Sequence, residues 1–285
     1  AGIINGTGNF ILSEMRDKGL SFEDVLEQAQ KLGYAEADPT FDIEGIDAAH
    51  KITIMASIAF GVPVQFDKVY TEGITKLTGE DIKNAEELGY RIKLLGITKR
   101  APKGIELRVH PTLIPSQRLI ANVEGVMNAV VVKGDAVGPT LYYGPGAGAE
   151  PTASSVVADL IDITRMHTSE PKHRVPYLAF QPNLLLDTPI LPMEEVETAY
   201  YLRLHALDKP GVLAEITRIL ADLEISIDAM VQKEPNEDED QVSIIVLTHL
   251  SIEKNINLAI NQIENLSSVM GKITRIRLEE LSSSH

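Results

Sequence analysis

The segment 201–234, YLRLHALDKPGVLAEITRILADLEISIDAMVQKE, shows most directly how the C-terminal part of the chain folds. It opens with alternating apolar residues, the pattern of a half-buried strand, and DKPG then supplies a turn. VLAEITRILADL repeats its apolar residues at helical spacing, and ISIDAMVQKE returns to the composition of a strand. The segment therefore predicts a strand, a turn, a helix and a second strand, in that order.

The residues that follow complete a regular pattern. We expect the acidic stretch PNEDED (235–240) to be a solvated hairpin tip and VSIIVLTHL (242–250) to be a strand. A helix over 252–266 and a strand over 272–280 come next. The order βαββαβ is the split βαβ pattern of ferredoxin-like domains. The sequence therefore predicts a small ferredoxin-like domain over 199–280, which would gain stability by pairing with a second copy.

Proline marks the N-terminal boundary of this domain. Five of the fifteen prolines lie between residues 171 and 192, a composition typical of a linker, which we assign to 166–198. Within it, VPYLAF (175–180) has the composition of a short strand. Residues 1–165 are then left as a separate, larger domain.

The larger domain is predicted to begin with helices. An apolar segment precedes Ser21, where a helix should start, and another helix should start at Thr78. Each of these two residues stands three positions before an aspartate, the looser form of the capping box. A further helix, 46–60, is apolar nearly all round after Lys51, which predicts that it is buried.

Residues 65–145 change to β-like runs. Two runs flank the turn APKG (101–104) and two more flank Gly134-Asp135, so each pair predicts a hairpin. A helix should follow from Thr152. We expect a mixed sheet with helices on one face, which together with the C-terminal domain gives the fold class α+β.

Composition excludes several classes of function. The chain has 285 residues, 44% hydrophobic and 24% charged, so it can bury a core. Its 26 basic and 41 acidic residues give a net charge of −15, which does not suit binding to nucleic acid. It has no cysteine and no histidines at metal-ligand spacing, so we assign no metal site. No apolar run approaches the ~20 residues of a membrane helix, so we expect no membrane partner.

One pair of charges stands out in the larger domain. Asp47 and Lys51 are four residues apart on the predicted helix 46–60 and therefore share one face. On a surface helix this would be an ordinary ion pair. At the start of an apolar helix, a charged lysine costs free energy unless it is paired or takes part in function. The same pair can therefore mark a functional site. The spacing alone leaves both interpretations open.

Longer motifs around this pair resemble a known family. GIINGTGNFILSEM (2–15), LGYAEADPT (32–40) and DIEGIDAAHK (42–51) are similar to the substrate-binding and catalytic domain of homoserine dehydrogenase. GAGAEPTASSVVADL (146–160) resembles the helix that returns, in this family, to the nucleotide-binding domain. The motifs are long and occur in the family's order, and the resemblance covers nearly the whole chain.

This resemblance implies the reversible reduction of L-aspartate 4-semialdehyde to L-homoserine, with NAD or NADP as the hydride carrier. Lys51 stands at the family's general acid/base lysine, and Asp47 is the catalytic candidate beside it. Glu36, Asp47 and Asp42 match acidic positions that would bind the substrate ammonium. Asp42 is equally consistent with a loop carboxylate that caps the next helix.

The implied cofactor contacts are Gly33, Glu36 and Gly148. Gly33 also fits the left-handed end of the preceding helix, and both roles are compatible because glycine permits close approach. The run 144–149 formally fits a dinucleotide-binding loop, but Pro145 stiffens it and no second parallel strand with an acidic end follows. The family's nucleotide-binding domain precedes these motifs. We therefore expect a chain that starts partway into a longer protein and is inactive alone.

The turn 208–213, DKPGVL, together with the βαββαβ order, resembles an ACT domain, the amino-acid-sensing module of biosynthetic enzymes. Gly211 would expose backbone N–H groups at a helix start, which suits a ligand carboxylate; a plain strand-to-helix turn is the alternative. The resemblance implies feedback inhibition by an amino acid, with threonine expected, between paired ACT domains. Asp228 and Gln232 are candidates for the opposing wall.

The expected protein is thus a cytoplasmic enzyme of threonine, methionine and isoleucine biosynthesis, a homodimer or homotetramer that pairs through the sheet of 65–145. The alternative from another class is a non-catalytic fragment that senses an amino acid and oligomerises.

Overall fold

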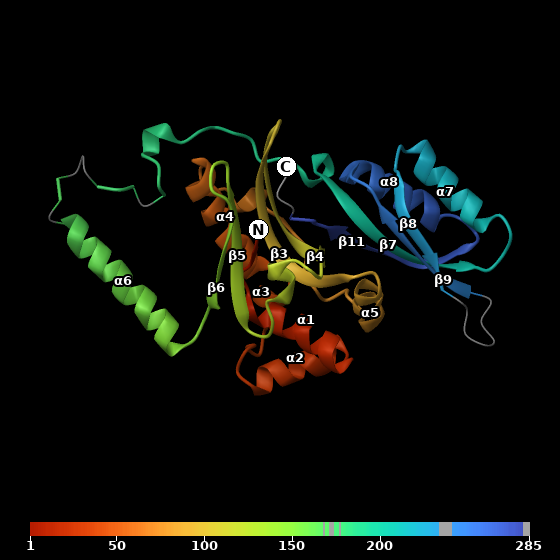
Figure 1. Ribbon diagram of the computed structural model, residues 1–285, viewed down its shortest axis with the longest axis horizontal. Coiled ribbons are helices and arrows are strands. Elements are labelled where there is room, and N and C mark those ends of the chain that lie inside the picture. Colours follow the sequence, from red (N-terminus) through yellow and green to blue (C-terminus); the bar gives the residue numbers. More distant parts are fainter. Residues whose placement is uncertain (168, 171–173, 177, 234–240, 282–285) are drawn as a thin grey trace.

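The computed structural model describes residues 1–167, 169–170, 174–176, 178–233 and 241–281 (Figure 1). Its α-helices are α1 (Gly6–Lys18), α2 (Phe22–Lys31), α3 (Thr40–Ile43), α4 (Ile46–Phe60), α5 (Gly79–Glu87), α6 (Ala149–His167), α7 (Val212–Asp222) and α8 (Glu253–Glu264). Its strands are β1 (Gly2–Ile3), β2 (Tyr70–Thr71), β3 (Tyr90–Ala101), β4 (Gly104–Pro115), β5 (Met127–Gly134), β6 (Gly138–Pro145), β7 (Glu197–Leu207), β8 (Ile227–Gln232), β9 (Gln241–Thr248), β10 (Ser251–Ile252) and β11 (Val269–Leu278). Short 3-10 turns include η1 (Phe66–Lys68), η2 (Leu119–Asn122), η4 (Pro182–Leu184) and η5 (Met193–Glu195).

One sheet runs through the described residues. Its strands follow the order β6-β5-β1-β3-β4-β11-β7-β9-β8, with β2 beside β4 and β10 beside β7. Most neighbours are antiparallel, but β2 and β11 each pair with β4 in parallel. The predicted mixed sheet and the fold class α+β are therefore confirmed.

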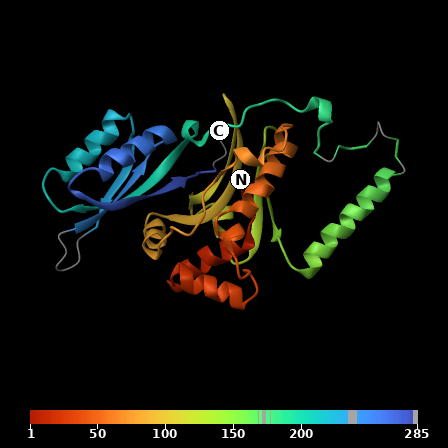
Figure 2. The same cartoon turned by 180° about the vertical axis from the view of Figure 1, so that it is seen from behind.

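The N-terminal part is built on two long hairpins. The β3–β4 hairpin is paired from Tyr90↔Pro115 to Ala101↔Gly104, and β5 pairs along its length with β6. The helices α1, α2 and α4 cover one face of these strands, as the view from behind shows (Figure 2). The apolar core between helices and sheet includes Ile11, Val25, Ile52, Leu94 and Val109. The expectation of helices on one face is thus met.

The sequence patterns missed α1, which lies in the apolar segment before Ser21. The Asn5 side chain caps its N-terminus by accepting a hydrogen bond from the Gly8 N–H, and Gly19, with φ 64°, ends it. Seven of its residues between Gly8 and Met15 are buried, so the helix presents no broad polar face. Without that contrast, the apolar periodicity is hidden.

The bounds predicted for α4 are those of the structure, but the prediction that the helix is buried nearly all round is wrong. Ile54 and Ile58 are 47% and 45% exposed. The face that carries Ala48, Ile52 and Ala56 packs into the core. Because one sheet covers only one side of a helix, the opposite side stays open within the described residues.

The helix α6 and the linker differ in part from expectation. The helix begins at Ala149, three residues before the predicted start at Thr152, contains no buried residue and lies apart from the sheet (Figure 1). The described residues of 175–180 form no strand, so that prediction is wrong; the proline-rich composition favours irregular backbone there. The linker nevertheless touches the larger part, because the Ile105 N–H donates to the Pro189 carbonyl at 2.9 Å.

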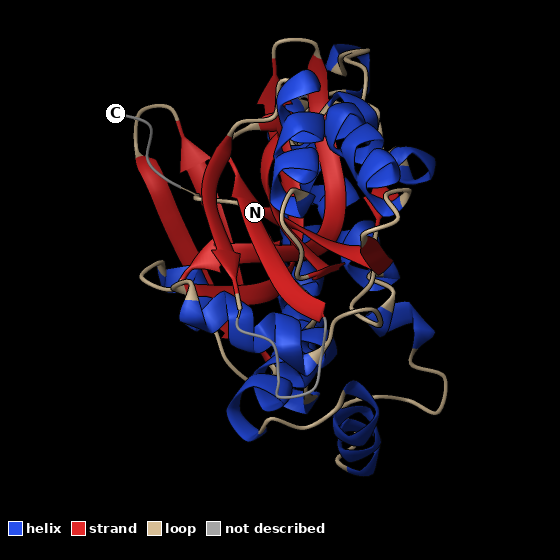
Figure 3. Ribbon diagram, turned by 90° about the vertical axis from the view of Figure 1, so that its right-hand side faces the viewer, coloured by secondary structure: helices blue, strands red, loops and turns tan. Residues whose placement is uncertain are grey.

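The C-terminal part has the predicted ferredoxin-like architecture. Its sheet follows the order β11-β7-β9-β8, and α7 and α8 pack side by side on one face (Figure 3). Its core includes Tyr200, Ile216, Ile244 and Ile263. The predicted hairpin tip at 235–240 lies outside the described residues.

A buried group of charges joins the two parts where β11 pairs with β4. We call Glu72, Arg108, Glu253, Arg277 and Glu279 the junction cluster. Arg277 donates to Glu253 at 2.9 Å and to Glu72 at 2.8 Å. Arg108 and Glu279 form a second pair, and Glu279 also accepts from Lys99 at 2.9 Å. The two parts are therefore tied by a shared sheet and by ion pairs as well as by the linker.

Candidate active site

The turn between α3 and α4 positions the first site residue. Gly45, at the N-cap of α4, has φ 78°, and a Cβ there would lie 3.0 Å from the Val109 Cγ1. A left-handed residue in so tight a space must be glycine. Asp47 consequently falls in the first turn of α4, where the helix dipole favours a negative charge.

Asp47 and Lys51 meet on one face of α4. The Lys51 Nζ donates to the Asp47 Oδ2 at 2.6 Å and to the Ile4 carbonyl at 2.9 Å. The side chains are 46% exposed for Lys51 and 23% exposed for Asp47. An ammonium has three N–H groups, so one remains uncommitted among the described residues. The arrangement holds the ammonium in place and leaves it a proton that can face a ligand.

Asn5, which the sequence patterns did not single out, joins two of the predicted acidic residues. Its Nδ2 donates to the Asp42 Oδ1 at 2.7 Å and to the Asp47 Oδ2 at 2.9 Å. Asn5 is only 6% exposed. We call Asn5, Asp42, Asp47 and Lys51 the site cluster. In the sequence, the preference of asparagine for helix N-caps was the only available signal, and it says nothing of these partners.

The loop after α2 carries two further predicted residues. Gly33 follows the last residues of α2 in the left-handed conformation, with φ 76°, and nothing lies within 4 Å of the place of a Cβ. Glu36 is exposed, and its carboxylate bonds to none of the described residues. The Thr7 hydroxyl donates to the Tyr34 carbonyl at 2.7 Å, which ties this loop to α1. The structure thus does not link Glu36 to the site cluster by a direct contact.

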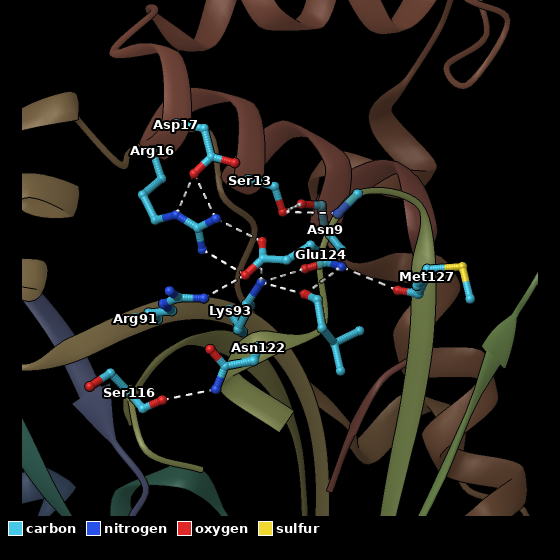
Figure 4. A network of polar contacts seen from close by, with 12 residues as sticks. Asn9, Ser13, Arg16, Asp17, Arg91, Lys93, Ser116, Asn122, Glu124 and Met127 are labelled. Atoms are coloured by element: carbon cyan, nitrogen blue, oxygen red, sulfur yellow. Dashed lines mark hydrogen bonds and ion pairs between the residues drawn. The ribbon is translucent and has the colours of Figure 1, made fainter. Parts of the chain in front are cut away.

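A buried polar network fixes α1 one turn beyond Asn5 (Figure 4). The Lys93 Nζ donates to the Asn9 Oδ1 at 3.1 Å and to the Val123 carbonyl at 2.6 Å. Asn9 in turn donates to the Met127 carbonyl at 3.2 Å. Burial lowers the pKa of Lys93 to about 8, and Glu124, 3.6 Å away, opposes that shift. We call Asn9, Lys93 and Glu124 the support network, and it anchors the helix whose N-cap belongs to the site cluster.

Gly148 is not brought to the site by any contact of the described residues. It has φ 119° and immediately precedes α6, which stands apart from the sheet (Figure 1). The α6 surface also exposes several large apolar side chains, namely Val156, Val157, Leu160, Ile161 and Ile163.

The C-terminal part contains a cavity of about 270 Å³ at the start of α7. It is lined by residues 207–213 together with Gln232, Val242 and Ile244. Gly211 is the N-cap of α7, and the Gln232 Nε2 donates to the Asp208 Oδ1 at 3.3 Å. The predicted residues Gly211 and Gln232 thus line one cavity.

Asp228 is not among the residues that line this cavity within one chain, and its place on an opposing wall between paired ACT domains stays a prediction. Its carboxylate lies 3.8 Å from the His249 Nε2. Asp228 precedes Gln232 by four residues on β8, which at about 3.3 Å per residue separates them by roughly 13 Å.

The described residues contain neither a membrane-spanning helix nor a metal-binding group of side chains. No helix there combines the length and the apolar character needed to cross a bilayer. No group of three or more histidine, aspartate or glutamate side chains there is arranged to hold a metal ion.

The chain matches two family descriptions: homoserine dehydrogenase over residues 1–161 and the ACT domain over residues 200–268. It is 65% identical to homoserine dehydrogenase of Pseudomonas aeruginosa, covering 99% of this chain and 65% of that protein. It is 61% identical to homoserine dehydrogenase of Neisseria gonorrhoeae, covering 99% of this chain and 64% of that protein.

A crystal structure of a homoserine dehydrogenase from Thiobacillus denitrificans superposes with a TM-score of 0.94 at 72% identity, covering 99% of this chain and 64% of that one. The chain thus spans just under two thirds of the relatives it matches. On these similarities, and with this fold, it belongs to the homoserine dehydrogenase family and carries an ACT domain.

Proposed function

We propose that this chain is the substrate-binding, catalytic and regulatory portion of a homoserine dehydrogenase that works together with a nucleotide-binding domain. In the reaction, L-aspartate 4-semialdehyde, NAD(P)H and a proton give L-homoserine and NAD(P)⁺. The observation that supports this most is the Lys51 ammonium, which is held by Asp47 and by the Ile4 carbonyl and, among the described residues, keeps one N–H uncommitted.

Lys51 is the proposed acid/base group. When the aldehyde is reduced, its oxygen gains negative charge, and the ammonium both stabilises that charge and donates the proton. In the reverse direction the amine takes the proton from the hydroxyl. Asp47 keeps the ammonium oriented, so that little reorganisation is needed when the charge develops.

The acidic residues are proposed to bind the ammonium of the substrate. Glu36 has an exposed carboxylate with no bond to the described residues, so it can accept a cationic ligand without breaking an internal contact. Asp42 and Asp47 add negative charge around Asn5, and Asp47 also lies beside Lys51. An amino acid would thus be preferred over an aldehyde that lacks the amine.

The cofactor is proposed to approach at Gly33 and Glu36 from one side and at Gly148 from the other. The open space at Gly33 permits close contact with a flat group, which agrees with such a role. When bound, NAD or NADP supplies or accepts the hydride. We further propose that the exposed apolar side of α6 packs on the nucleotide-binding domain, which completes the cofactor site.

The acid/base assignment is tested in a protein in which this chain is joined to its nucleotide-binding domain, here called the joined protein. Lys51→Ala should lower kcat by about 10²–10⁴-fold, with a smaller change in KM. Lys31→Ala is the matched control, because Lys31 has the same i,i+4 pair with Glu27 at 2.6 Å on the surface of α2. A kcat close to that of the unchanged protein would overturn the assignment.

Regulation is proposed at the α7 cavity. Backbone N–H groups at Gly211 and a helix N-terminus suit the carboxylate of an amino acid, threonine being the one expected. A hundredfold excess of threonine over its Kd should stabilise the chain by about 2.7 kcal/mol and raise its Tm. Gly211→Asp should abolish the shift, whereas Asp222→Asn, at the exposed C-terminal end of α7 and outside the cavity, should keep it. If threonine, isoleucine and methionine all leave the Tm unchanged, the sensing role is wrong.

A further inference from the structure

We infer that Asn5 is a positioning residue: its amide sets Asp47 against Lys51 and thereby aims the lysine at the reacting oxygen. The inference rests on the proposed role of Lys51. Asn5 comes 46 positions before Lys51 in the sequence, and among the described residues no hydrogen bond joins the two side chains. It acts through two groups that it holds, the carboxylates of Asp42 and Asp47.

The two ends of the Asn5 side chain have separate tasks. Its Oδ1 accepts from the Gly8 N–H at 2.7 Å and so caps α1. Its Nδ2 carries two protons, and each is donated to a different carboxylate. Capping alone requires only the oxygen, so the bridge between carboxylates is an additional function of the nitrogen.

The bridge determines where Asp47 can lie. The Asp47 Oδ2 accepts from both Asn5 and Lys51, so this single oxygen is fixed by a buried amide on one side and holds the ammonium on the other. Asp42 fixes the amide from its far side at 2.7 Å. Two carboxylates this close repel each other, and a neutral donor between them offsets that repulsion without neutralising the charge near Lys51.

The side-chain type follows from these demands. Serine, threonine and aspartate cap a helix about as well as asparagine. None of them offers two N–H donors together with a capping oxygen. Aspartate, which has nearly the same shape, would place a third carboxylate beside the other two. Among these capping residues, only asparagine supplies both the oxygen that caps α1 and the two N–H groups that bind the carboxylates.

The first test measures turnover in the joined protein. Asn5→Ser keeps a capping oxygen and loses the bridge, so kcat should fall about tenfold to a hundredfold while KM and Tm change much less. Asn5→Asp should lower kcat by at least the same factor. Ser13→Ala is the control, since it removes a hydrogen bond of α1 to the Gly125 N–H, on the side of the support network. An equal loss of kcat in Ser13→Ala would show a general effect of disturbing α1 and overturn the inference.

A double-mutant comparison checks that Asn5 acts through Asp47. In an Asp47→Ala background, replacing Asn5 by serine should cost no further residual kcat, because the group it positions is gone. A second loss as large as the first would contradict the inference.

The second test needs neither cofactor nor turnover and uses the chain itself. Competitive labelling with acetic anhydride, followed by peptide mass spectrometry, measures the reactivity of the Lys51 amine, with Lys31 as internal reference. Asn5→Ser should raise the relative reactivity of Lys51 about two- to fivefold, because its carboxylate partner is no longer held. Unchanged reactivity overturns the positioning role even if Lys51→Ala abolishes turnover. Changed reactivity with an unchanged kcat overturns the acid/base role of Lys51, and with it the inference.

Discussion

The site cluster and the junction cluster consist of similar charged groups but use them differently. In the site cluster, the Lys51 side chain is 46% exposed and keeps an uncommitted N–H. In the junction cluster, Arg277 is fully buried and donates to Glu253, Glu72 and the Tyr70 hydroxyl. Charges that are to meet a ligand stay partly hydrated and incompletely paired, whereas charges that only hold structure must be fully paired before they can be buried.

The burial of the junction cluster has a second consequence. The fully buried His110 imidazole lies 2.6 Å from the Arg108 Nη1, and burial together with the neighbouring arginines lowers its pKa well below the ordinary value. A neutral ring accepts a hydrogen bond from the Arg108 guanidinium and adds no charge of its own. Among the described residues, the two arginines of the junction cluster are thus paired with carboxylates, and Arg108 also with a neutral histidine.

The sharpest test of this contrast is Arg277→Met, with an expected loss of about 3 kcal/mol in the free energy of unfolding. The substitution leaves the buried Glu253 carboxylate and the partly exposed Glu72 carboxylate with Arg275 as their one remaining ion-pair partner among the described residues. Urea denaturation measures the loss. The control is Lys272→Met on the same strand, because the Lys272 side chain is 89% exposed and its 2.6 Å pair with Glu264 should matter little. Equal effects of the two substitutions would remove the distinction between buried and exposed pairs.

The support network beneath α1 is intermediate between the partly hydrated site cluster and the buried junction cluster. The pH dependence of the free energy of unfolding tests this. Lys93 has a pKa of about 8 in the folded chain against an ordinary value of 10.5, so between these values the unfolded chain binds more protons. The free energy of unfolding should therefore rise with pH in that window, by about 2 kcal/mol from pH 7 to pH 10 for this group.

Denaturation curves at the two pH values, compared with those of Lys93→Met, isolate this contribution. The variant should lack the rise, while Lys103→Met, at an 80% exposed position near the β3–β4 turn, should retain it. If the curve of Lys93→Met follows that of the unchanged chain, Lys93 does not carry a depressed pKa.

The smallest expected change in the free energy of unfolding is that of a substitution in the site cluster. Because the Asp47–Lys51 pair is half hydrated, Lys51→Met should change the free energy of unfolding by less than about 1 kcal/mol. The difference should shrink further as salt is raised. A loss as large as that of Arg277→Met would mean that Lys51 holds the fold, and it would weaken its proposed role in proton transfer.

Local patterns predicted much of the architecture. The helix α4 was expected at 46–60 and lies there, and Thr78 forms the expected capping box with Asp81 at the start of α5. The hairpin around 101–104 and the βαββαβ order of the C-terminal part were also predicted correctly. These features depend on neighbours within a few residues, where propensity and periodicity are informative.

The candidate site could be predicted only in part. The spacing of Asp47 and Lys51 on one helix placed them on a common face, because the helical repeat fixes that relation. The similarity of the motifs to the family added Asp42, Glu36 and Gly33 to the candidate site residues. Asn5 was missed because its partners lie 37 and 42 residues away, beyond any local repeat.

The sequence by itself therefore determined most of the helices, though not α1, together with the hairpins and the common face of Asp47 and Lys51, all of which follow from short-range backbone geometry. Only the tertiary structure decided that the N-cap of α1 would bridge two carboxylates of the α3–α4 region and that β11 would join β4. Arg277 meets Glu72 across 205 residues. Such contacts form when the whole sheet and its helices pack, because burial requires each charge to find a partner wherever the fold places one.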